Sequence, residues 1–226
     1  MLLSPGVEYS SDKRNTDGMD NGNGSGNGMP NSGLVKITNP DVKVTLPVLK
    51  YGYRTTKASW EELIRIIEVE YDIPKLSRSR AQQHDYEVFR YHMKKQYRST
   101  LDFILISKFG FDAVADGDGD GDGDNNCQQR WKADPCLEDV PKNPQRIILV
   151  ENDFPYFIEE NIVHYVLWKL KEKITPQEIS EARERLQSEP VEALELLEWV
   201  NPPYLKSIPE IDHVHFLCRL GANRKT

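Results

Sequence analysis

Apolar residues in the first half of the chain recur three and four positions apart, which is the spacing of one helix face. The first such stretch follows Ser59, which with Glu62 forms a capping box, and it ends before Pro74. The same spacing predicts a second helix over 80–97 and a third over 100–109. The first half of the chain is therefore expected to be helical.

The second half changes to short β-branched runs. Residues 146–150 and 162–168 predict two neighbouring antiparallel strands, and residues 213–219 predict a third strand. Cap and first-turn proline signals predict one helix over about 175–187 and another over about 188–200. These elements predict an α+β fold, with a helical N-terminal half packed on a small antiparallel sheet that helices interrupt.

Two segments lack the apolar residues that folding needs. Residues 1–33 are rich in Asn, Gly and Ser and predict a disordered tail. Asp and Gly alternate over 116–124, which predicts an acidic low-complexity loop insertion at about 112–142. The run fits part of an EF-hand, but Cys127 stands where that loop needs a bidentate Glu. We therefore expect one α+β domain over 34–226 that carries a solvated insertion.

Charge and composition exclude several classes of protein. The chain of 226 residues has 29 Lys and Arg against 36 Asp and Glu, a net charge of -7, which disfavours nucleic-acid binding through phosphate neutralisation. No stretch reaches the roughly 18 apolar residues of a membrane span, and the opening apolar run is too short for a signal peptide. The 3 cysteines lack the spacing of a disulfide framework or a zinc site. A cytoplasmic protein is expected.

Three histidines are the main candidates for chemistry. His213 and His215 are two residues apart in the last predicted strand, so their side chains project from one face of the sheet. His164 lies in the predicted strand 162–168, and the three imidazoles converge if the two strands are neighbours. We expect His213 to face solvent in a cleft rather than the core. The alternative is a pair of partly exposed histidines without a function.

Polar residues at the ends of the same strands are expected to line this cleft. Glu151, Asn152 and Asp153 follow the strand 146–150, although Asn and Asp next to Pro155 are also typical of a plain turn. Asn201 and Ser207 lie in the loop that leads into the histidine strand. Contact of the Ser207 hydroxyl with a phosphate and simple capping of a turn are both open.

Cations and aromatic residues complete the candidate set. Arg78, Arg80 and Arg219 are the side chains that could hold a phosphate through a bidentate fork, and surface ion pairs are the alternative for each. Trp168 and Trp199 each lie in an apolar stretch, so we expect them in the core rather than in a ligand pocket.

Several of these blocks together resemble a known family. The segments ENDFPY at 151–156, His164 with VLW at 166–168, and WVNPPYLKSIPEIDHVHF at 199–216 are similar to the fungal N-acetylglucosamine-induced protein 1 family. The similarity extends over nearly all of the chain from about residue 57, apart from the Asp-Gly insertion. It implies a cytoplasmic fungal protein whose expression responds to amino sugar and whose shared domain has no known function.

A more distant resemblance suggests a mechanism. The stretch IDHVHFLCR at 211–219 is similar in register to the last strand of histidine-triad nucleotide hydrolases and transferases. In that register His213 matches the nucleophile that attacks an α-phosphate, and His215 matches a flanking partner. Ile211 stands where the first histidine of the triad would be, which puts catalysis in doubt. Arg219 or Arg78 would neutralise the phosphate oxygens.

Three functions are consistent with these residues. The first is binding of a sugar phosphate or nucleotide sugar in the cleft, with phosphohydrolase or nucleotidyl-transferase activity at His213 if the protein is an enzyme. The second is a metal-dependent enzyme that uses His164, His213, His215 and Asp153. The third is a non-catalytic regulatory protein. The sequence identifies no cofactor and no protein partner, and it favours neither nucleic acid nor membrane as a partner.

Overall fold

The computed structural model describes residues 42–117, 130–134 and 146–221, all of which belong to the unit Ser32–Thr226. The tail 1–33, most of the Asp-Gly run and Cys127 lie outside these residues. None of the described helices is long and apolar enough to cross a membrane. The described residues form helices and two antiparallel sheets, which confirms the predicted α+β class.

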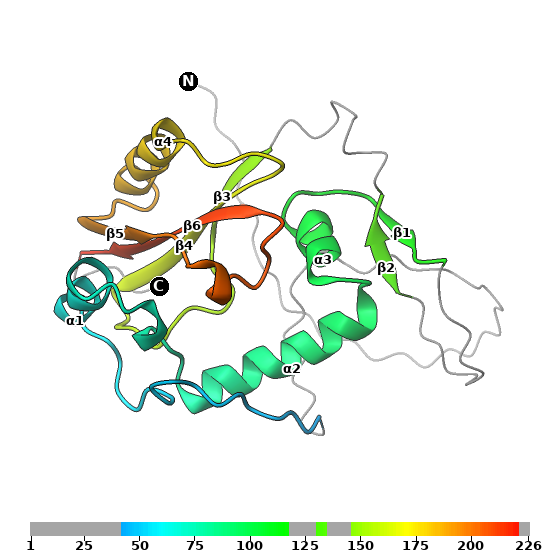
Figure 1. Ribbon diagram of the computed structural model, residues 1–226. Helices are drawn as coiled ribbons and strands as arrows, with labels where there is room; N and C mark the ends of the chain where they lie inside the picture. Colours follow the sequence, from blue (N-terminus) through cyan, green and yellow to red (C-terminus); the bar gives the residue numbers. More distant parts are fainter. Residues whose placement is uncertain (1–41, 118–129, 135–145, 222–226) are drawn as a thin grey trace, which may run out of the picture. The chain divides into compact units, whose positions relative to one another are not determined.

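The larger sheet has four antiparallel strands in the order β3-β4-β6-β5 (Figure 1). Their bounds are Ile147–Glu151 for β3, Ile162–Lys169 for β4, Glu195–Trp199 for β5 and Asp212–Arg219 for β6. β4 and β6 are the central strands, and their register places Val166 opposite His215 and Trp168 opposite His213. The predicted neighbours 146–150 and 162–168 are confirmed as the pair β3 and β4.

Each face of this sheet has its own apolar core. Helix α4 (Pro176–Gln187) covers one face, where Leu186 packs with residues such as Phe216 and Cys218 (Figure 1). Strand alternation sends His164, His213 and His215 to the opposite face. There the sheet packs at one end on α1 (Trp60–Ile64) with the π-helix η1 (Arg65–Val69), and at the other end on α3 (Thr100–Ser107).

The next two helices lie within the predicted ranges 80–97 and 100–109, and each starts at a serine cap. The long helix α2 (Arg80–Gln96) starts at a capping box formed by Ser79 and Gln82, and Ser99 caps α3. Two short 3-10 turns, η2 (Ile73–Lys75) and η4 (Pro203–Leu205), follow Asp72 and Pro202. The first helical stretch was expected to end before Pro74. It ends at Val69, and Pro74 lies inside the turn η2.

The predicted helix over 188–200 is wrong. Helix α4 ends at Ser188, a tight turn follows, and residues 195–199 form strand β5. The segment ELLEW has good helix formers, but pairing with residues 215–219 of β6 buries Leu197 and Trp199 on the histidine face. Tertiary pairing therefore overrides local propensity, and α4 is the α-helix that interrupts the sheet.

Part of the predicted loop insertion is also structured. Residues 113–115 and 131–133 form the antiparallel strands β1 (Ala113–Ala115) and β2 (Trp131–Ala133). The backbone N–H of Ala133 donates a 2.9 Å hydrogen bond to the buried Asp102 of α3. Strands of three residues give too little periodicity to be predicted beside a low-complexity run.

Candidate functional site

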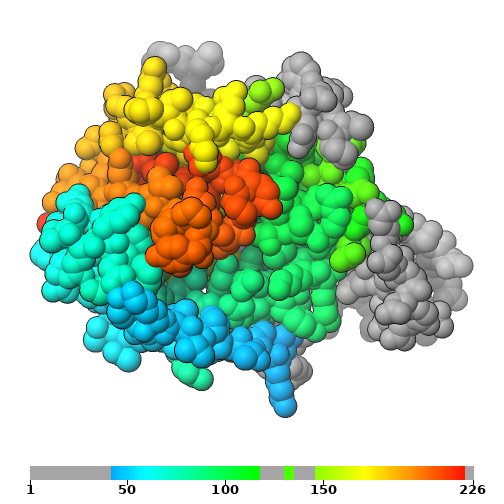
Figure 2. Space-filling view, in the orientation of Figure 1, coloured from blue at the N-terminus to red at the C-terminus, as the bar shows by residue number. Residues whose placement is uncertain are grey.

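A pocket of about 540 Å³ lies on the histidine face of the sheet. Its walls come from η2, α2, α3, the ends of β3 and β4, the loop around η4, and β6. In the space-filling view the surface is hollowed between the blue residues near Lys50 and the orange residues near Leu205, which both line the pocket (Figure 2). The volume is in the range of small-molecule sites.

The three histidines come together as the strand pattern predicts. His164 Nε2 lies 3.0 Å from His215 Nδ1, and the rings of His213 and His215 are 5.3 Å apart between centroids. His213 and His215 line the pocket, whereas His164 lies behind them. All three are buried, with exposed fractions of 2% for His164, 3% for His213 and 7% for His215. The expectation that His213 faces solvent is therefore wrong, because the helices and loops around the pocket cover it.

Burial keeps these imidazoles neutral. Desolvation lowers the pKa of His164 from 6.5 to about 3, and the charge of Arg78 acts in the same direction. The pKa of His215 falls well below its usual value, first through desolvation and then through its histidine neighbours. Desolvation also lowers the pKa of His213. A neutral imidazole has one nitrogen that carries the proton and donates, and one that accepts. The hydrogen-bond partners therefore show which nitrogen carries the proton.

Asn201 orients the buried histidine pair. Its Oδ1 accepts a 3.0 Å hydrogen bond from the indole N–H of Trp199, so its Nδ2 must donate to His215 Nε2 at 3.0 Å. The proton of His215 is then on Nδ1, from which it donates to His164 Nε2. The two imidazoles and Asn201 thus form one buried hydrogen-bonded chain at the pocket floor.

His213 has a different arrangement. Its Nδ1 donates a 2.9 Å hydrogen bond to the backbone carbonyl of Ile211, which leaves the lone pair on Nε2. No described residue donates a hydrogen bond to that nitrogen. The ring packs on Trp168 at 4.6 Å between centroids. His213 therefore presents a neutral, unoccupied base or nucleophile at a fixed orientation in the pocket wall.

Arg78 is one of three described cations that line the pocket, beside Lys50 and Lys108. Its Nε and Nη2 donate to the carbonyl of Phe154 at 3.1 and 2.7 Å, and its Nη1 donates to Gln83 at 3.2 Å. The guanidinium lies 4.3 Å from the centre of the Tyr86 ring, and desolvation lowers its pKa. Among the described residues no carboxylate pairs with it, and two of the five guanidinium N–H groups stay available. Arg78 is thus a partly buried cation with no described carboxylate at salt-bridge distance, although the charge of Glu87 acts on it from further away.

The bend after β3 serves both as a turn and as a pocket wall. Asn152 Oδ1 accepts a 3.0 Å hydrogen bond from the backbone of Phe154, which is the turn that the sequence allowed. The Nδ2 of Asn152 lies 3.2 and 3.5 Å from the two nitrogens of His164. Asp153 lines the pocket, but it is neutralised by Lys108 at 2.6 Å. Glu151 also lines the pocket.

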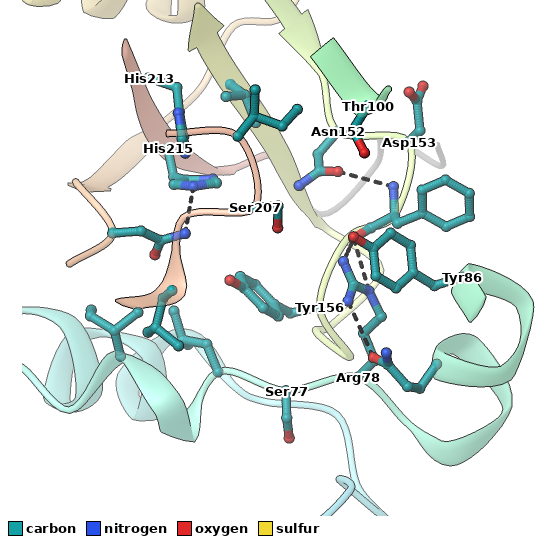
Figure 3. A pocket seen from close by; sticks show the side chains of 18 of the residues that line it. Ser77, Arg78, Tyr86, Thr100, Asn152, Asp153, Tyr156, Ser207, His213 and His215 are labelled. Atoms are coloured by element: carbon teal, nitrogen blue, oxygen red, sulfur yellow. Dashed lines mark hydrogen bonds between the residues drawn. The ribbon is translucent and has the colours of Figure 1, made fainter. Parts of the chain in front are cut away.

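Most of the other predicted residues reach the pocket. Asn201 and Ser207 line it, and Ser207 lies between the arginine side and the histidine side in the close view (Figure 3). Arg219 does not reach it. Although Arg219 is on the histidine face, it sits at the far end of β6, where it pairs with Glu195 at 3.0 Å and lies over Trp60. Arg80 is exposed, near the ring of Tyr53.

The proposed metal ligands do not form a ligand set. No group of three or more His, Cys, Asp or Glu residues in the described ranges is arranged to hold a metal ion. The nitrogens of His164 and His215 face each other, and Asp153 faces Lys108.

Several pocket residues were not recognised from sequence. Tyr86 and Phe89 lie on the apolar face of α2, and Tyr156 lies in the bend after β3; all three line the pocket. The Tyr156 ring stacks on His164 at 5.2 Å, and burial raises the pKa of its hydroxyl. The available signal was the pair of tyrosines, because rings that carry a polar hydroxyl often border a pocket.

Comparisons with known proteins identify the domain but no activity. A family model described as protein of unknown function (DUF3605) matches residues 59–219. A solved chain described as HTC1 is similar at 23% identity with a TM-score of 0.44, and the match covers 74% of this chain and 88% of that one. No curated protein matches the sequence.

Proposed function

The chain belongs to the DUF3605 family of proteins of unknown function, and from the geometry of its pocket we propose that it binds a small phosphorylated ligand. The observation that carries this proposal is Arg78. A desolvated cation costs free energy unless an anion pairs with it, and no described carboxylate does so. A phosphate group in the pocket supplies that anion and accepts the two remaining N–H donors.

The surroundings of Arg78 suit a monoester phosphate. The carbonyl of Phe154 and the amide of Gln83 hold the guanidinium in one orientation, so little side-chain entropy is lost on binding. The carboxylate of Asp153 is already neutralised by Lys108 and does not repel an anion strongly. In Figure 3 Arg78 and Tyr86 lie on one side of the pocket and His213 and His215 on the other.

The test is isothermal titration calorimetry with inorganic phosphate and with phosphate monoesters. Arg78→Gln should weaken binding by at least tenfold, since a charge-assisted hydrogen bond contributes about 1.5–3 kcal/mol. Arg80→Gln is the matched control, because Arg80 lies two residues away and is exposed. The proposal fails if wild-type protein binds no phosphate compound, or if binding survives in Arg78→Gln. Melting curves of both variants show whether the fold is intact.

A second candidate function is phosphoester hydrolysis at His213, favoured by the unoccupied Nε2 lone pair in the pocket wall. In this reaction Nε2 forms a bond to phosphorus and the leaving oxygen departs with the electron pair of the broken P–O bond. Water then attacks phosphorus, releases the histidine and protonates the leaving group. The Ile211 carbonyl orients His213, where histidine-triad enzymes would have a further histidine. Arg219 lies too far along β6 to take part.

Hydrolysis is tested by 31P NMR of a nucleotide sugar incubated with the protein. Activity at His213 predicts turnover that His213→Asn abolishes while phosphate binding through Arg78 persists. Turnover that is equal in both proteins contradicts a role for His213. Binding without turnover in wild-type protein leaves the pocket as a binding site and removes the enzyme hypothesis.

The resemblance to N-acetylglucosamine-induced proteins adds ligands and a cellular setting to the proposal. N-acetylglucosamine 6-phosphate and nucleotide sugars belong in the first set of ligands tested. A cytoplasmic fungal protein that responds to amino sugar would meet such phosphates. The net charge of -7 continues to disfavour nucleic acid as a partner.

A further inference from the structure

Seven of the described aromatic side chains line the pocket. Tyr204 is exposed, and each of the other six is only partly buried: Tyr86, Phe89, Phe103, Phe154, Tyr156 and Trp168. Trp168 is the clearest case, because it lies in a central strand between Ile148 and His213 and would normally be covered. Apolar surface left open to water costs about 25 cal/mol per Å², so a pocket with many open rings gains from a ligand that covers them.

The rings form connected walls. Phe154 lies 5.1 Å from Tyr86 and 4.7 Å from Phe89, and Phe89 lies 5.3 Å from Phe103, between centroids. On the sheet, Trp168 packs on His213 at 4.6 Å. These spacings are those of offset and edge-to-face aromatic pairs, which a further ring extends favourably. Tyr86 also contacts Arg78, so an aromatic wall reaches the phosphate anchor directly.

The amide side chains around the pocket are already engaged within the protein, which leaves hydroxyls such as those of Thr100 and Ser207 as its small polar groups. A bound sugar needs a partner for each buried hydroxyl, since an unpaired one is costly. The amides of Gln83, Asn152 and Asn201 already bond to other protein groups, and Asp153 pairs with Lys108. The lining thus combines one strong anion anchor with extensive ring surface.

Building on the proposed phosphate site, we propose that the ligand is an aromatic phosphate, in which a planar apolar ring accompanies the phosphate held by Arg78. The phosphate pairs with the guanidinium, and the ring covers the open faces of the aromatic walls. The non-phosphate part of the ligand is then an aromatic ring, a chemical class that is named neither by the family description nor by the resemblance.

The test compares two ligands of equal charge and similar ring size, phenyl phosphate and glucose 1-phosphate, by calorimetry on the full chain. Phenyl phosphate should bind at least tenfold more tightly. Trp168→Leu should weaken phenyl phosphate by roughly three- to tenfold, the range expected for one aromatic contact, and should change glucose 1-phosphate by less than twofold. Trp131→Leu is the matched control, because Trp131 lies in β2, outside the pocket lining.

The outcomes separate this inference from the proposed function. Equal or tighter binding of glucose 1-phosphate, still dependent on Arg78, overturns the aromatic ligand and leaves the phosphate site standing. If neither compound binds, both proposals fail. Adenosine 5′-monophosphate, as a third ligand, shows whether the ring must be bonded to the phosphate or can be carried by a ribose. The wild-type ligand comparison decides the matter even if Trp168→Leu does not fold.

Discussion

The two faces of strands β4 and β6 are built from alternate residues of the same segments, yet they differ in what covers them. On one face Val163, Leu167, Phe216 and Cys218 pack under α4 in a closed apolar core. On the other face Trp168, His213 and His215 line a pocket between the packed helices, and His164 contacts His215. Period-two alternation thus places a closed apolar core on one face of the sheet and a polar pocket on the other.

The difference teaches where this domain tolerates polar groups. Around Cys218 on the α4 face burial is apolar, and it raises the pKa of the Cys218 thiol to about 12, which leaves that group unreactive. On the pocket face buried histidines are held by specific polar partners, such as Asn201 for His215 and the Ile211 carbonyl for His213. Changes on the α4 face should therefore affect folding, and changes on the pocket face should affect pH response and binding.

The largest effect is expected from the α4 face. Phe216→Ala should lower the free energy of unfolding by about 3–5 kcal/mol, because it removes a fully buried ring and leaves a cavity. Urea unfolding measures this loss. Phosphate affinity per folded molecule should stay within twofold of wild type. A fall in affinity at equal folded fraction would contradict the separation of the two faces.

The pocket face should respond to pH. The folded-state pKa values of the buried histidines are lowered, to about 3 for His164, so the unfolded chain binds protons first as the pH falls. Their contribution to stability is complete above about pH 6.5 and declines below it, by up to about 1.4 kcal/mol per pH unit for each histidine. Unfolding measured between pH 7 and pH 4 tests this expectation.

His164→Gln sharpens the pH experiment. It removes one of the three titrating imidazoles, so stability should fall less steeply between pH 6.5 and pH 4 than in wild type. Phe216→Leu, on the other face, should lower stability by a similar amount at every pH. An unchanged pH slope in His164→Gln would show that this imidazole is not kept neutral by burial.

Asn201 should show an intermediate effect. Asn201→Ala leaves the indole N–H of Trp199 and His215 Nε2 without their partner, at a cost of about 1–3 kcal/mol. Thermal unfolding at pH 7.5 measures the loss. Asn201→Asp keeps an acceptor for Trp199 but removes the donor to His215, so it should recover part of the stability only. Full recovery would contradict the assigned donor direction.

The smallest effect is expected at the solvent edge between α4 and β5. Arg183 pairs with Glu198, with Nε at 2.7 Å from Oε2, and both side chains are partly exposed. Exposed ion pairs contribute about 0.2–1 kcal/mol, so Arg183→Ala should shift stability by no more than that. A double-mutant cycle with Glu198→Ala isolates the pair. A larger coupling energy would mean that this edge has a structural role.

The sequence predicted what depends on local pattern. The spacing of His213 and His215, and the position of His164 in a neighbouring strand, were sufficient to bring three imidazoles together. The helix predicted over 188–200 was wrong, because residues 195–199 become a strand only by pairing with β6. Nothing within the segment itself indicates a strand. Local periodicity carries no information about such tertiary pairing.

The pocket itself depended on features that a sequence does not display. Arg78 was identified as a candidate cation, but its lack of a carboxylate partner is a property of the folded chain. Trp168 was expected in the core, because an apolar run does not show that one of its rings stays uncovered. Arg219 does not reach the pocket, because it lies at the far end of β6.

The most direct test of the central claim is a crystal structure of the protein soaked with tungstate, a heavy analogue of phosphate that is located by anomalous scattering. The account predicts an anomalous peak on the histidine face, with tungstate oxygens about 3 Å from the guanidinium nitrogens of Arg78. It is contradicted if Arg78 is paired with a carboxylate in that crystal, or if tungstate is ordered only elsewhere on the protein.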